Sequence, residues 1–540
     1  MGAVRGMVLA GWLALAPAVA VPAPAPTPEE LEAAGAVIGS ITILNGDVFD
    51  TSLPEENRPL FRLANKLHIE TRPEVVRSQL LFKEGDRYSV STLRESERIL
   101  RSNNYLFDAR IAPVAYHDGV VDLEVRTRDV WTLKPAFNFG RKGGKNESSF
   151  EFEESNLLGL GKQIDLSHSR DVDRDSNLIH YRDPHLFGSW NRLDVAYSSN
   201  SDGKLRKFRL DRPFYSLHTP WSAGIDLADW NRIDSRYDLG EVVDKFRHEE
   251  QSAEVFGGWS AQLSDSWIRR LTVGLSYQRD RFEAANDPAA AVLPMNRKLV
   301  YPFMELQLLQ DAYEERRNQD QIERTEDFYA GTSLRLRLGY ASESFGSDRN
   351  AILLDAAASR SFGFGDDLKH TLVLSADAAT RIEQSELRNA QLTGTARFYW
   401  RFSARHLFYA LVSSTVSDEL DADRQILLGG DNGLRGYPLR YQDGTASALL
   451  TLEHRIYTKY YLFRLFNVGG AVFFDMGRTW GRGNAGGASQ GLLKDVGVGL
   501  RLGSSRSAFG NVIHIDLAMP LDGDDSIDNL QLLVGTKRSF

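Results

Sequence analysis

The sequence predicts a membrane all-β protein, in which one small α+β domain precedes a C-terminal transmembrane antiparallel β-barrel. From Trp131 onward, runs of about ten residues alternate apolar and polar side chains, as the strands of such a barrel do. Many of these runs end on aromatic residues, which are typical of membrane interfaces. After Pro28, no uncharged apolar stretch approaches the ~18 residues of a membrane-spanning helix. A soluble all-β domain is the alternative interpretation of the same runs.

The composition restricts the classes of function. The 540 residues carry a formal net charge of -9, and the sequence pI is near 5.8. Nucleic-acid binding normally requires a basic face, so nucleic acid is not expected as a partner. The chain has no cysteine, which excludes disulfides, thiolate metal sites and a catalytic thiol. These features fit a protein that is exported through an oxidising compartment.

Residues 1–20 are interpreted as a secretory signal peptide. Arg5 precedes an apolar run at residues 7–16, and Ala18-Val19-Ala20 has the small-x-small form of a signal-peptidase site. An N-terminal membrane anchor is the alternative. Residues 21–36 begin with alternating alanine and proline and are expected to form an extended leader.

The first domain is placed at residues 37–128 and the barrel at residues 129–540. Apolar and polar side chains alternate at residues 37–43, which predicts a strand. Thr71-x-x-Glu74 and Thr92-x-x-Glu95 have the form of capping boxes, so each is predicted to begin a helix. Asp118-Gly119 is a hairpin turn signal between two further strands. The predicted order is β-α-α-β-β.

The barrel should contain roughly twenty strands by our tally of alternating runs. The clearest run is Leu334-Arg-Leu-Arg-Leu338, in which leucines occupy one face and arginines the other. A closed barrel must pair its first and last strands, which we place at residues 131–140 and 529–540.

This seam between the first and last strands is expected to be weak. Trp131 and Gly140 mark the first strand, and Arg538 and Phe540 mark the last. Arg538 interrupts an otherwise apolar face, and Gly140 brings no side chain to the pairing. An interrupted seam exposes backbone groups that can accept an incoming strand by β-augmentation.

Arg435 is the candidate for a latch between a loop and a strand of the barrel. It lies in LLGGDNGLRGYP, residues 427–438, where glycines, a charge and a tyrosine interrupt the strand pattern. Asp475 is the single carboxylate in the apolar, strand-like run at residues 472–477. A guanidinium and a carboxylate in these positions can form a bidentate, partly desolvated pair.

The sequence predicts no enzyme, no cofactor and no metal. Residues 487–491, GASQG, match G-x-S-x-G, but a nucleophile elbow needs a strand before it and a helix after it, and this string lies in a polar connection. The acidic cluster Asp421-Ala-Asp423 could bind calcium, but it lacks the spacing of an EF-hand and is expected to be a solvated loop.

These residues resemble the BamA/TamA-type outer-membrane assembly-factor superfamily, also called the bacterial surface-antigen family. Leu434-Arg435-Gly436-Tyr437 is similar to the (V)RG(F/Y) tip of its sixth extracellular loop, although leucine replaces the common valine. Phe474-Asp475-Met476-Gly477 is similar to the strand motif whose acid receives that arginine. Three further segments resemble the early barrel signatures and one polypeptide-transport-associated (POTRA) domain: residues 156–161, 181–188 and 38–128.

The resemblance implies a barrel of sixteen strands in the outer membrane of a Gram-negative cell, with the first domain in the periplasm. It implies unfolded outer-membrane or secreted polypeptides as clients, the lipid bilayer as surroundings, and accessory periplasmic proteins or lipoproteins as partners. The implied function is the assembly and insertion of barrel proteins, or polypeptide translocation. A two-partner-secretion pore is the first alternative, and a passive porin or surface antigen is the second. Two departures are the single POTRA-like domain and the long link at residues 46–69.

Overall fold

The computed structural model describes residues 26–537, except for residues 265, 286–291, 366–369, 485–490, 508–511 and 524–526. The predicted signal peptide, most of the GASQG string, Arg538 and Phe540 lie outside the described residues.

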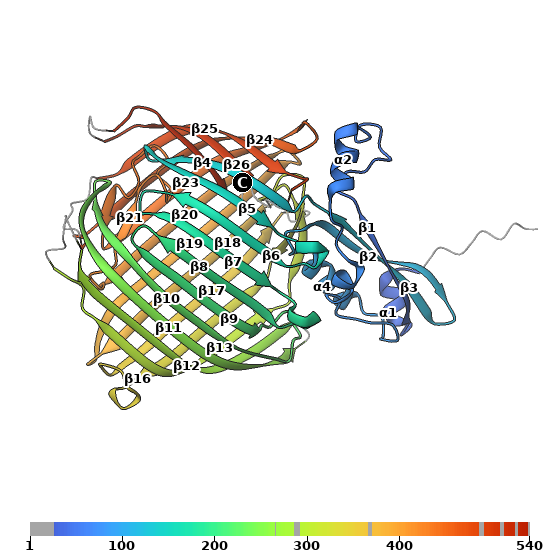
Figure 1. The fold of residues 1–540 in the computed structure, drawn as a ribbon, viewed down its shortest axis with the longest axis horizontal. Helices are drawn as coiled ribbons and strands as arrows, with labels where there is room; N and C mark the ends of the chain where they lie inside the picture. Colours follow the sequence, from blue (N-terminus) through green and yellow to red (C-terminus); the bar gives the residue numbers. More distant parts are fainter. Residues whose placement is uncertain are drawn as a thin grey trace, which may run out of the picture.

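The N-terminal domain is a three-stranded sheet covered by helices (Figure 1). Strand β3 (Val120–Asp129) lies in the middle, parallel to β1 (Val37–Gly46) and antiparallel to β2 (Leu106–His117). Its helices are α1 (Pro28–Ala33), α2 (Pro59–Leu67), α3 (Pro73–Arg77) and α4 (Val90–Arg101). The apolar sides of α1, α3 and α4 form one buried core with the sheet, centred on residues such as Leu31, Val76, Leu100 and Leu123, whereas Phe61 of α2 belongs to a separate cluster.

Two helices of this domain differ from the predicted β-α-α-β-β order. Helix α1 lies in the segment that we assigned to an extended leader, and it begins with a capping box between Thr27 and Glu30. Helix α2 fills the long link after β1. Both predicted capping boxes are wrong: α3 starts after Arg72 and α4 after Ser89, with no side-chain cap. The hairpin at Asp118-Gly119 is confirmed, with φ values of 53° and 80°.

The second part of the chain is a closed antiparallel barrel of twenty strands (Figure 1). Our tally of roughly twenty is confirmed, and the sixteen implied by the resemblance is wrong. The strands are β4 (Leu133–Lys142), β5 (Lys145–Glu154), β6 (Gln163–Arg170), β7 (Asp175–Asp183), β8 (Arg192–Asn200), β9 (Gly203–Arg212), β10 (Trp221–Asp238), β11 (Glu241–Ser264), β12 (Trp267–Ala284), β13 (Arg297–Gln310), β16 (Thr332–Ala341), β17 (Ala351–Phe364), β18 (His370–Glu383), β19 (Glu386–Ser403), β20 (His406–Asp418), β23 (Ala446–Leu462), β24 (Phe466–Trp480), β25 (Leu493–Ser504), β26 (Val512–Pro520) and β27 (Gln531–Lys537).

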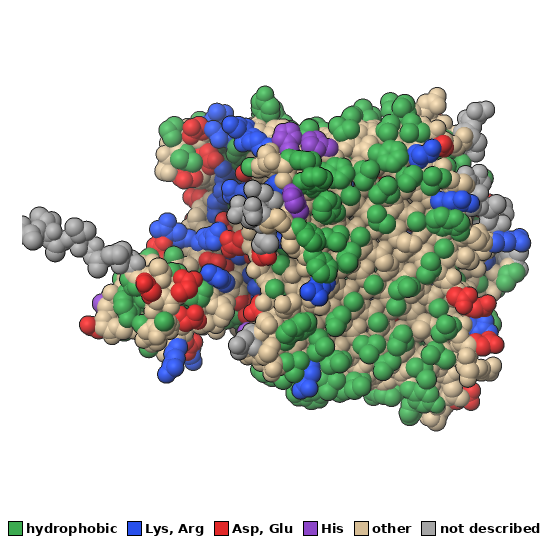
Figure 2. All heavy atoms as spheres, turned by 180° about the vertical axis from the view of Figure 1, so that it is seen from behind, with side chains coloured by type: hydrophobic (Ala, Val, Ile, Leu, Met, Phe, Trp, Pro, Cys, Tyr) green, Lys and Arg blue, Asp and Glu red, His purple; other side chains and the backbone are tan. Residues whose placement is uncertain are grey.

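Alternation along the strands produces an apolar outer surface and a charged interior. On β16, Leu334, Leu336 and Leu338 are exposed on the outside, whereas Arg335 and Arg337 pair inside with Glu305 and Glu254. Figure 2 shows apolar side chains over the middle of the barrel wall and charged side chains towards its ends. This distribution is that of a barrel embedded in lipid. Within the described residues, the helices are all too short or too polar to cross a membrane.

Two connections of the barrel carry strands of their own. The connection between β13 and β16 holds a hairpin of β14 (Tyr313–Arg317) and β15 (Thr325–Tyr329), at the barrel end that faces the N-terminal domain. The connection between β20 and β23, residues 419–445, holds β21 (Ile426–Leu428) and β22 (Gln442–Gly444) at the opposite end. We call these two segments the near-end hairpin and the latch loop.

The latch loop is the eighth connection at its end of the barrel, whereas the resemblance implies the sixth. The difference arises because the four additional strands all precede the loop. Five strands, β23 to β27, separate it from the end of the barrel sequence, as they would in a sixteen-stranded barrel with its loop in sixth place.

Candidate functional site

Arg435 lies inside the barrel and forms a bidentate pair with Asp475. Its Nε donates to Oδ2 of Asp475 at 2.6 Å, and its Nη2 donates to Oδ1 at 3.0 Å. The guanidinium also lies over the ring of Phe473, with 3.3 Å between Cζ and the ring centroid. Arg435 is 7% exposed and Asp475 is fully buried, so the structure brings the two predicted residues together out of water. Loss of one partner from such a pair leaves an uncompensated buried charge.

The pair belongs to a larger group of buried charges that the sequence reasoning missed. Nη1 of Arg435 donates to Oε2 of Glu453 on β23 at 3.0 Å and lies 3.7 Å from Oδ2 of Asp516 on β26. Arg501 on β25 pairs with Asp516 and lies 3.6 Å from Glu453. Because acids from three strands of the wall, β23, β24 and β26, lie around Arg435, the barrel wall holds the latch loop at several points.

Gly436 and Gly477 let the loop approach this wall closely. A Cβ atom on Gly436 would lie 2.6 Å from Cβ of Asp495 and 3.0 Å from the backbone nitrogen of Pro520. A Cβ atom on Gly477 would lie 3.3 Å from side-chain atoms of both Leu428 and Leu434 of the loop. Both glycines therefore serve the seating of the loop rather than a turn.

Tyr437 fixes the next residue of the motif to the wall. The side chain is fully buried, and its hydroxyl donates to the carbonyl oxygen of Lys494 at 2.8 Å and also lies 3.0 Å from the carbonyl oxygen of Asp522. The carbonyl of Lys494 belongs to β25, and that of Asp522 belongs to the connection between β26 and β27. Tyr437 therefore attaches the loop to the wall close to the seam.

Asp495 is an acid of this site that no motif predicted. It is the direct cross-strand partner of Asp475 and is completely buried. Two buried carboxyl groups thus face each other across β24 and β25, and only Asp475 receives the guanidinium.

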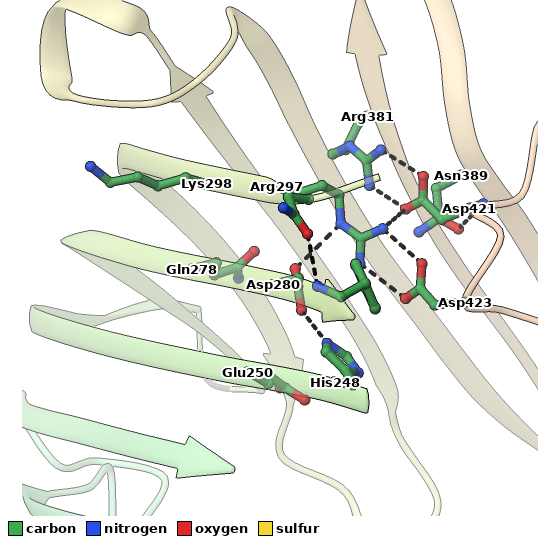
Figure 3. Close-up of polar contacts among 12 residues, drawn as sticks. His248, Glu250, Gln278, Asp280, Arg297, Lys298, Arg381, Asn389, Asp421 and Asp423 are labelled. Carbon is green, nitrogen blue, oxygen red and sulfur yellow. Dashed lines mark hydrogen bonds and ion pairs between the residues drawn. The ribbon is translucent and has the colours of Figure 1, made fainter. Parts of the chain in front are cut away.

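The base of the latch loop is fastened separately, as Figure 3 shows. Arg297 on β13 donates to both oxygens of Asp423, at 2.7 and 3.0 Å, and Arg381 on β18 donates to both oxygens of Asp421, at 2.7 and 2.9 Å. The prediction of a solvated acidic loop is therefore wrong, and so is the calcium alternative, because arginines already occupy these carboxylates.

His248, Glu250 and Asp280 beside this base are the one metal-like cluster found among the described residues, with ligand atoms within 4.8 Å of one another. Each ring nitrogen of His248 already contacts an aspartate, Asp234 at 2.8 Å and Asp280 at 2.9 Å. Arg297 also pairs with Asp280 (Figure 3). The cluster is thus part of the ion-pair network that lines the interior, and it does not need a cation to balance its charges.

Between β4 and β27, the described residues pair at one position, Val534 with Arg141, whereas those of β26 and β27 pair at seven positions and those of β4 and β5 at ten. Gly140 lies at this contact, where a Cβ atom would be 3.2 Å from the carbonyl oxygen of Val534. Just before β4, Trp131 donates its backbone N–H to the carbonyl oxygen of Arg506 at 2.8 Å and forms an isolated β-bridge with Ser507.

The latch loop touches the seam directly. Gly143 lies in the turn between β4 and β5 with φ +49°, and a Cβ atom there would lie 2.2 Å from the backbone nitrogen of Leu439. A Cβ atom on Gly430 would come within 3.0 Å of Gly143 Cα. A cavity of about 300 Å³ lies beside this contact, lined by the loop, Arg435 and the inner side of β27. The loop therefore packs on the turn that follows the first seam strand and lies next to the last seam strand.

The near-end hairpin crosses the barrel mouth to the wall opposite its own strands. Nη1 of Arg455 on β23 donates to the carbonyl oxygen of Gln319 at 2.8 Å and to Oδ1 of Asp320 at 3.1 Å. Ile322 of the hairpin is buried among Tyr457 and other side chains of β19 to β26. The hairpin thus occupies the interior at the end near the N-terminal domain.

The same hairpin binds the N-terminal domain. Arg101 of α4 donates to both oxygens of Asp327, at 2.9 and 2.5 Å, and Arg110 of β2 donates to both oxygens of Glu315, at 3.2 and 2.9 Å. Residues 156–161, which resemble an early barrel signature, add a second contact: a Cβ atom on Gly159 would lie 2.3 Å from the carbonyl oxygen of Glu70.

Comparisons with known proteins agree with this geometry. Residues 156–537 match the Omp85 superfamily domain, and residues 68–129 match the surface antigen variable number repeat, a POTRA domain. No curated protein matches the sequence significantly.

Among solved structures, the chain is similar to BamA from Haemophilus ducreyi lacking POTRA domains 1–3, with 13% identity over 93% of this chain and 84% of that one and a TM-score of 0.38. It is also similar to CdiB from Acinetobacter baumannii, with 13% identity over 93% and 73% and a TM-score of 0.43. The third is CdiB from Escherichia coli, with 14% identity over 92% and 75% and a TM-score of 0.45.

Proposed function

We propose that this chain, which belongs to the Omp85 superfamily, inserts unfolded β-barrel polypeptides into the outer membrane. The proposed route is the seam between β4 and β27. Family membership supports insertion or translocation at the outer membrane. The choice of insertion, and of the seam as its place, is the part that we add from the geometry.

The single ladder pair between the described residues of β4 and β27 is the observation that carries this proposal. Backbone N–H and C=O groups of a seam strand that have no ladder partner are open to an incoming strand. Such groups in a lipid-facing wall are costly, and an incoming strand of a client can satisfy them by β-augmentation. At the seam, therefore, a client strand can form new backbone hydrogen bonds while breaking few existing ones.

The latch loop contacts this seam, and we infer that the contact is reversible. It is held by Arg435 and packs on the turn that follows β4, at Gly143. While Arg435 is bound to Asp475, the loop braces the first seam strand. Release of the loop would free β4 to separate from β27.

Clients would first meet the N-terminal domain. Strand β2 is an edge of its sheet, and Val114 and Tyr116 on it are exposed. An extended segment of an unfolded polypeptide can pair with such an edge through main-chain hydrogen bonds. The edge strand thus offers a waiting position before the seam.

Translocation through the interior, as in a two-partner-secretion pore, is the alternative role. It requires the latch loop and the near-end hairpin to leave the interior, because each contacts the wall from one end of the barrel. Insertion at the seam leaves the hairpin in place and therefore breaks fewer contacts than translocation through the interior. This difference favours insertion, and it also argues against a passive porin.

A disulfide across the seam tests the proposal. Cysteines in place of Arg141 and Val534, the paired residues, should crosslink in a chain that has no other cysteine. In cells depleted of the native protein, the crosslinked variant should support neither growth nor normal levels of outer-membrane proteins. Both should recover when a reductant is added. Cysteines in place of Arg141 and Asn146 are the control, because this pair joins β4 to β5 and leaves the seam free.

If the locked seam supports normal outer-membrane protein levels, insertion through it is excluded. Loss of a single secreted protein in depleted cells, with unchanged barrel proteins, would point to the translocation role instead.

A further inference from the structure

Helix α2 presents a row of leucines to the outside of the N-terminal domain. Leu60, Leu63 and Leu67 are 70%, 51% and 63% exposed, and their spacing places them on one face of the helix. Neighbouring Leu53 and Ile69 are exposed as well. An exposed apolar row of this kind indicates a surface that is covered in the working protein.

The other face of α2 holds the helix against the rim of the barrel. Phe61 is buried and stacks on Phe49 with 4.2 Å between ring centroids. Both rings pack with Trp131, at the start of β4, and with Leu465, in the turn between β23 and β24. Figure 1 shows α2 at the end of the barrel, level with the wall that contains β24.

The rim beside α2 is itself apolar and exposed. In the turn and strand end that lead to Leu465, Tyr460 is 76% exposed and Phe463 is 74% exposed. Exposed aromatic residues at the end of a barrel strand are typical of the membrane–water interface. The leucine row therefore continues a band of side chains that already lies at the level of the lipid headgroups.

The charges of α2 fit an anionic surface. The helix contains no acidic residue, and Arg58 and Lys66 at its two ends are exposed. Of the acids outside the helix, Glu56 is buried and paired with Arg506 of the barrel, whereas Glu55 and Glu70 are exposed. A leucine face on a helix whose own charges are all basic is the composition of helices that lie in a membrane interface.

We propose that α2 is an interfacial anchor, which inserts Leu60, Leu63 and Leu67 into the periplasmic leaflet of the outer membrane beside the seam. Helices of this kind bury their apolar face about 5–10 Å into the boundary of headgroups and acyl chains. Since α2 also packs on Trp131, the anchor fixes the N-terminal domain next to the first seam strand. The occupant of the leucine face is phospholipid, not a polypeptide.

A fluorescence measurement in vesicles tests the anchor without any other protein. The full chain with Leu63→Cys, labelled with an environment-sensitive dye, is reconstituted in phosphatidylethanolamine and phosphatidylglycerol vesicles that contain lipids spin-labelled near the headgroup. The dye should be quenched several-fold more strongly than the same dye at Val114→Cys. Val114 is 57% exposed and lies near the tip of the β2–β3 hairpin, which extends away from the barrel (Figure 1).

A second variant separates insertion from mere proximity. Leu60→Glu together with Leu67→Glu should reduce the quenching at position 63 to the level at Val114, because glutamates resist burial in lipid. Equal quenching at positions 63 and 114 in the unmodified background would overturn the proposal. It would also be overturned if the dye at position 63 responded only after an unfolded barrel polypeptide was added, since the leucines would then bind a client.

Discussion

Glu453 and Arg455 lie two residues apart on the inner face of β23 and pair with each other, with 2.9 Å between Arg455 Nε and Glu453 Oε1. Glu453 also accepts a hydrogen bond from Arg435 of the latch loop, and Arg455 also donates to Asp320 of the near-end hairpin. One pair of neighbouring residues thus joins the segments that enter the interior from its two ends. If the loop moves, Glu453 loses Arg435 as a partner, and Glu453 is also the partner of the arginine that binds the hairpin.

The two facing aspartates should respond in opposite directions to the same substitution. Asp475→Asn removes the charge that pairs with Arg435 and should destabilise the barrel by on the order of 3 kcal/mol. Asp495→Asn replaces the buried carboxyl group beside Asp475 by an amide of the same shape that cannot carry a like charge, so stability should stay the same or rise. Urea unfolding in lipid vesicles measures both, and equal loss for the two variants would contradict this account of the site.

Gly436→Ala should displace the latch loop, because its Cβ would lie 2.6 Å from Asp495 Cβ. Overpacking of this kind costs typically 1–3 kcal/mol. Limited proteolysis should cut the loop of the variant faster than that of the unmodified protein. Gly394→Ala on β19 is the control, since nothing lies within 4 Å of the position that the added methyl group would take. Unchanged proteolysis in Gly436→Ala would show that the close approach is not required.

Arg455→Lys should loosen the near-end hairpin. Lysine cannot hold Glu453 and Asp320 with the planar fork that arginine provides. A spin label on the hairpin should become more mobile in this variant. Arg335→Lys is the matched control, because Arg335 also faces the interior but pairs with Glu305 of the barrel wall, at 3.6 Å. Equal mobility in both variants would exclude a supporting role for Arg455.

Shortening the hairpin tip should open the barrel mouth. Replacement of residues 318–323 by two glycines removes the contacts with Arg455, Tyr457 and the buried cluster around Ile322. Conductance in planar bilayers should rise from a low baseline to frequent or steady openings. A steady, large conductance of the unmodified protein would instead support the porin alternative.

Arg101→Gln should free the N-terminal domain from the hairpin. The bidentate pair with Asp327 is 4% and 18% exposed at its two side chains, and its loss leaves a partly buried carboxylate. Distances between spin labels on α4 and on the barrel should broaden. Arg94→Gln changes a residue of the same helix whose pair with Glu29 is mostly exposed, and it should leave the distances unchanged.

The sequence was most informative where a short period repeats. Leu334 to Leu338 and similar runs predicted both the barrel and the number of its strands, because each strand shows the two-residue alternation by itself. The sixteen strands implied by the resemblance were a weaker guide than this tally. The α1 helix could have been found from Thr27 and Glu30, but the proline-rich stretch before it suggested an extended leader.

The candidate site was predicted only in part. Arg435 and Asp475 stood out because a motif surrounds each of them. Glu453 and Arg455 carried a weaker signal, two charges of equal parity in a long apolar strand, and their partners come from a loop and a hairpin far away in sequence. Nothing local marks the β14–β15 hairpin as one that enters the interior, since its fold depends on the wall that it meets.

The placement of the extra strands has a further consequence. A barrel with more strands has a larger diameter, and here all the growth lies between the first strand and the latch loop. The five strands from β23 to β27 keep the loop at a constant distance from the closing edge. In such an architecture, separate stretches of the polypeptide determine the diameter of the barrel and the position of the latch loop relative to the seam. The diameter can therefore change while that position stays the same.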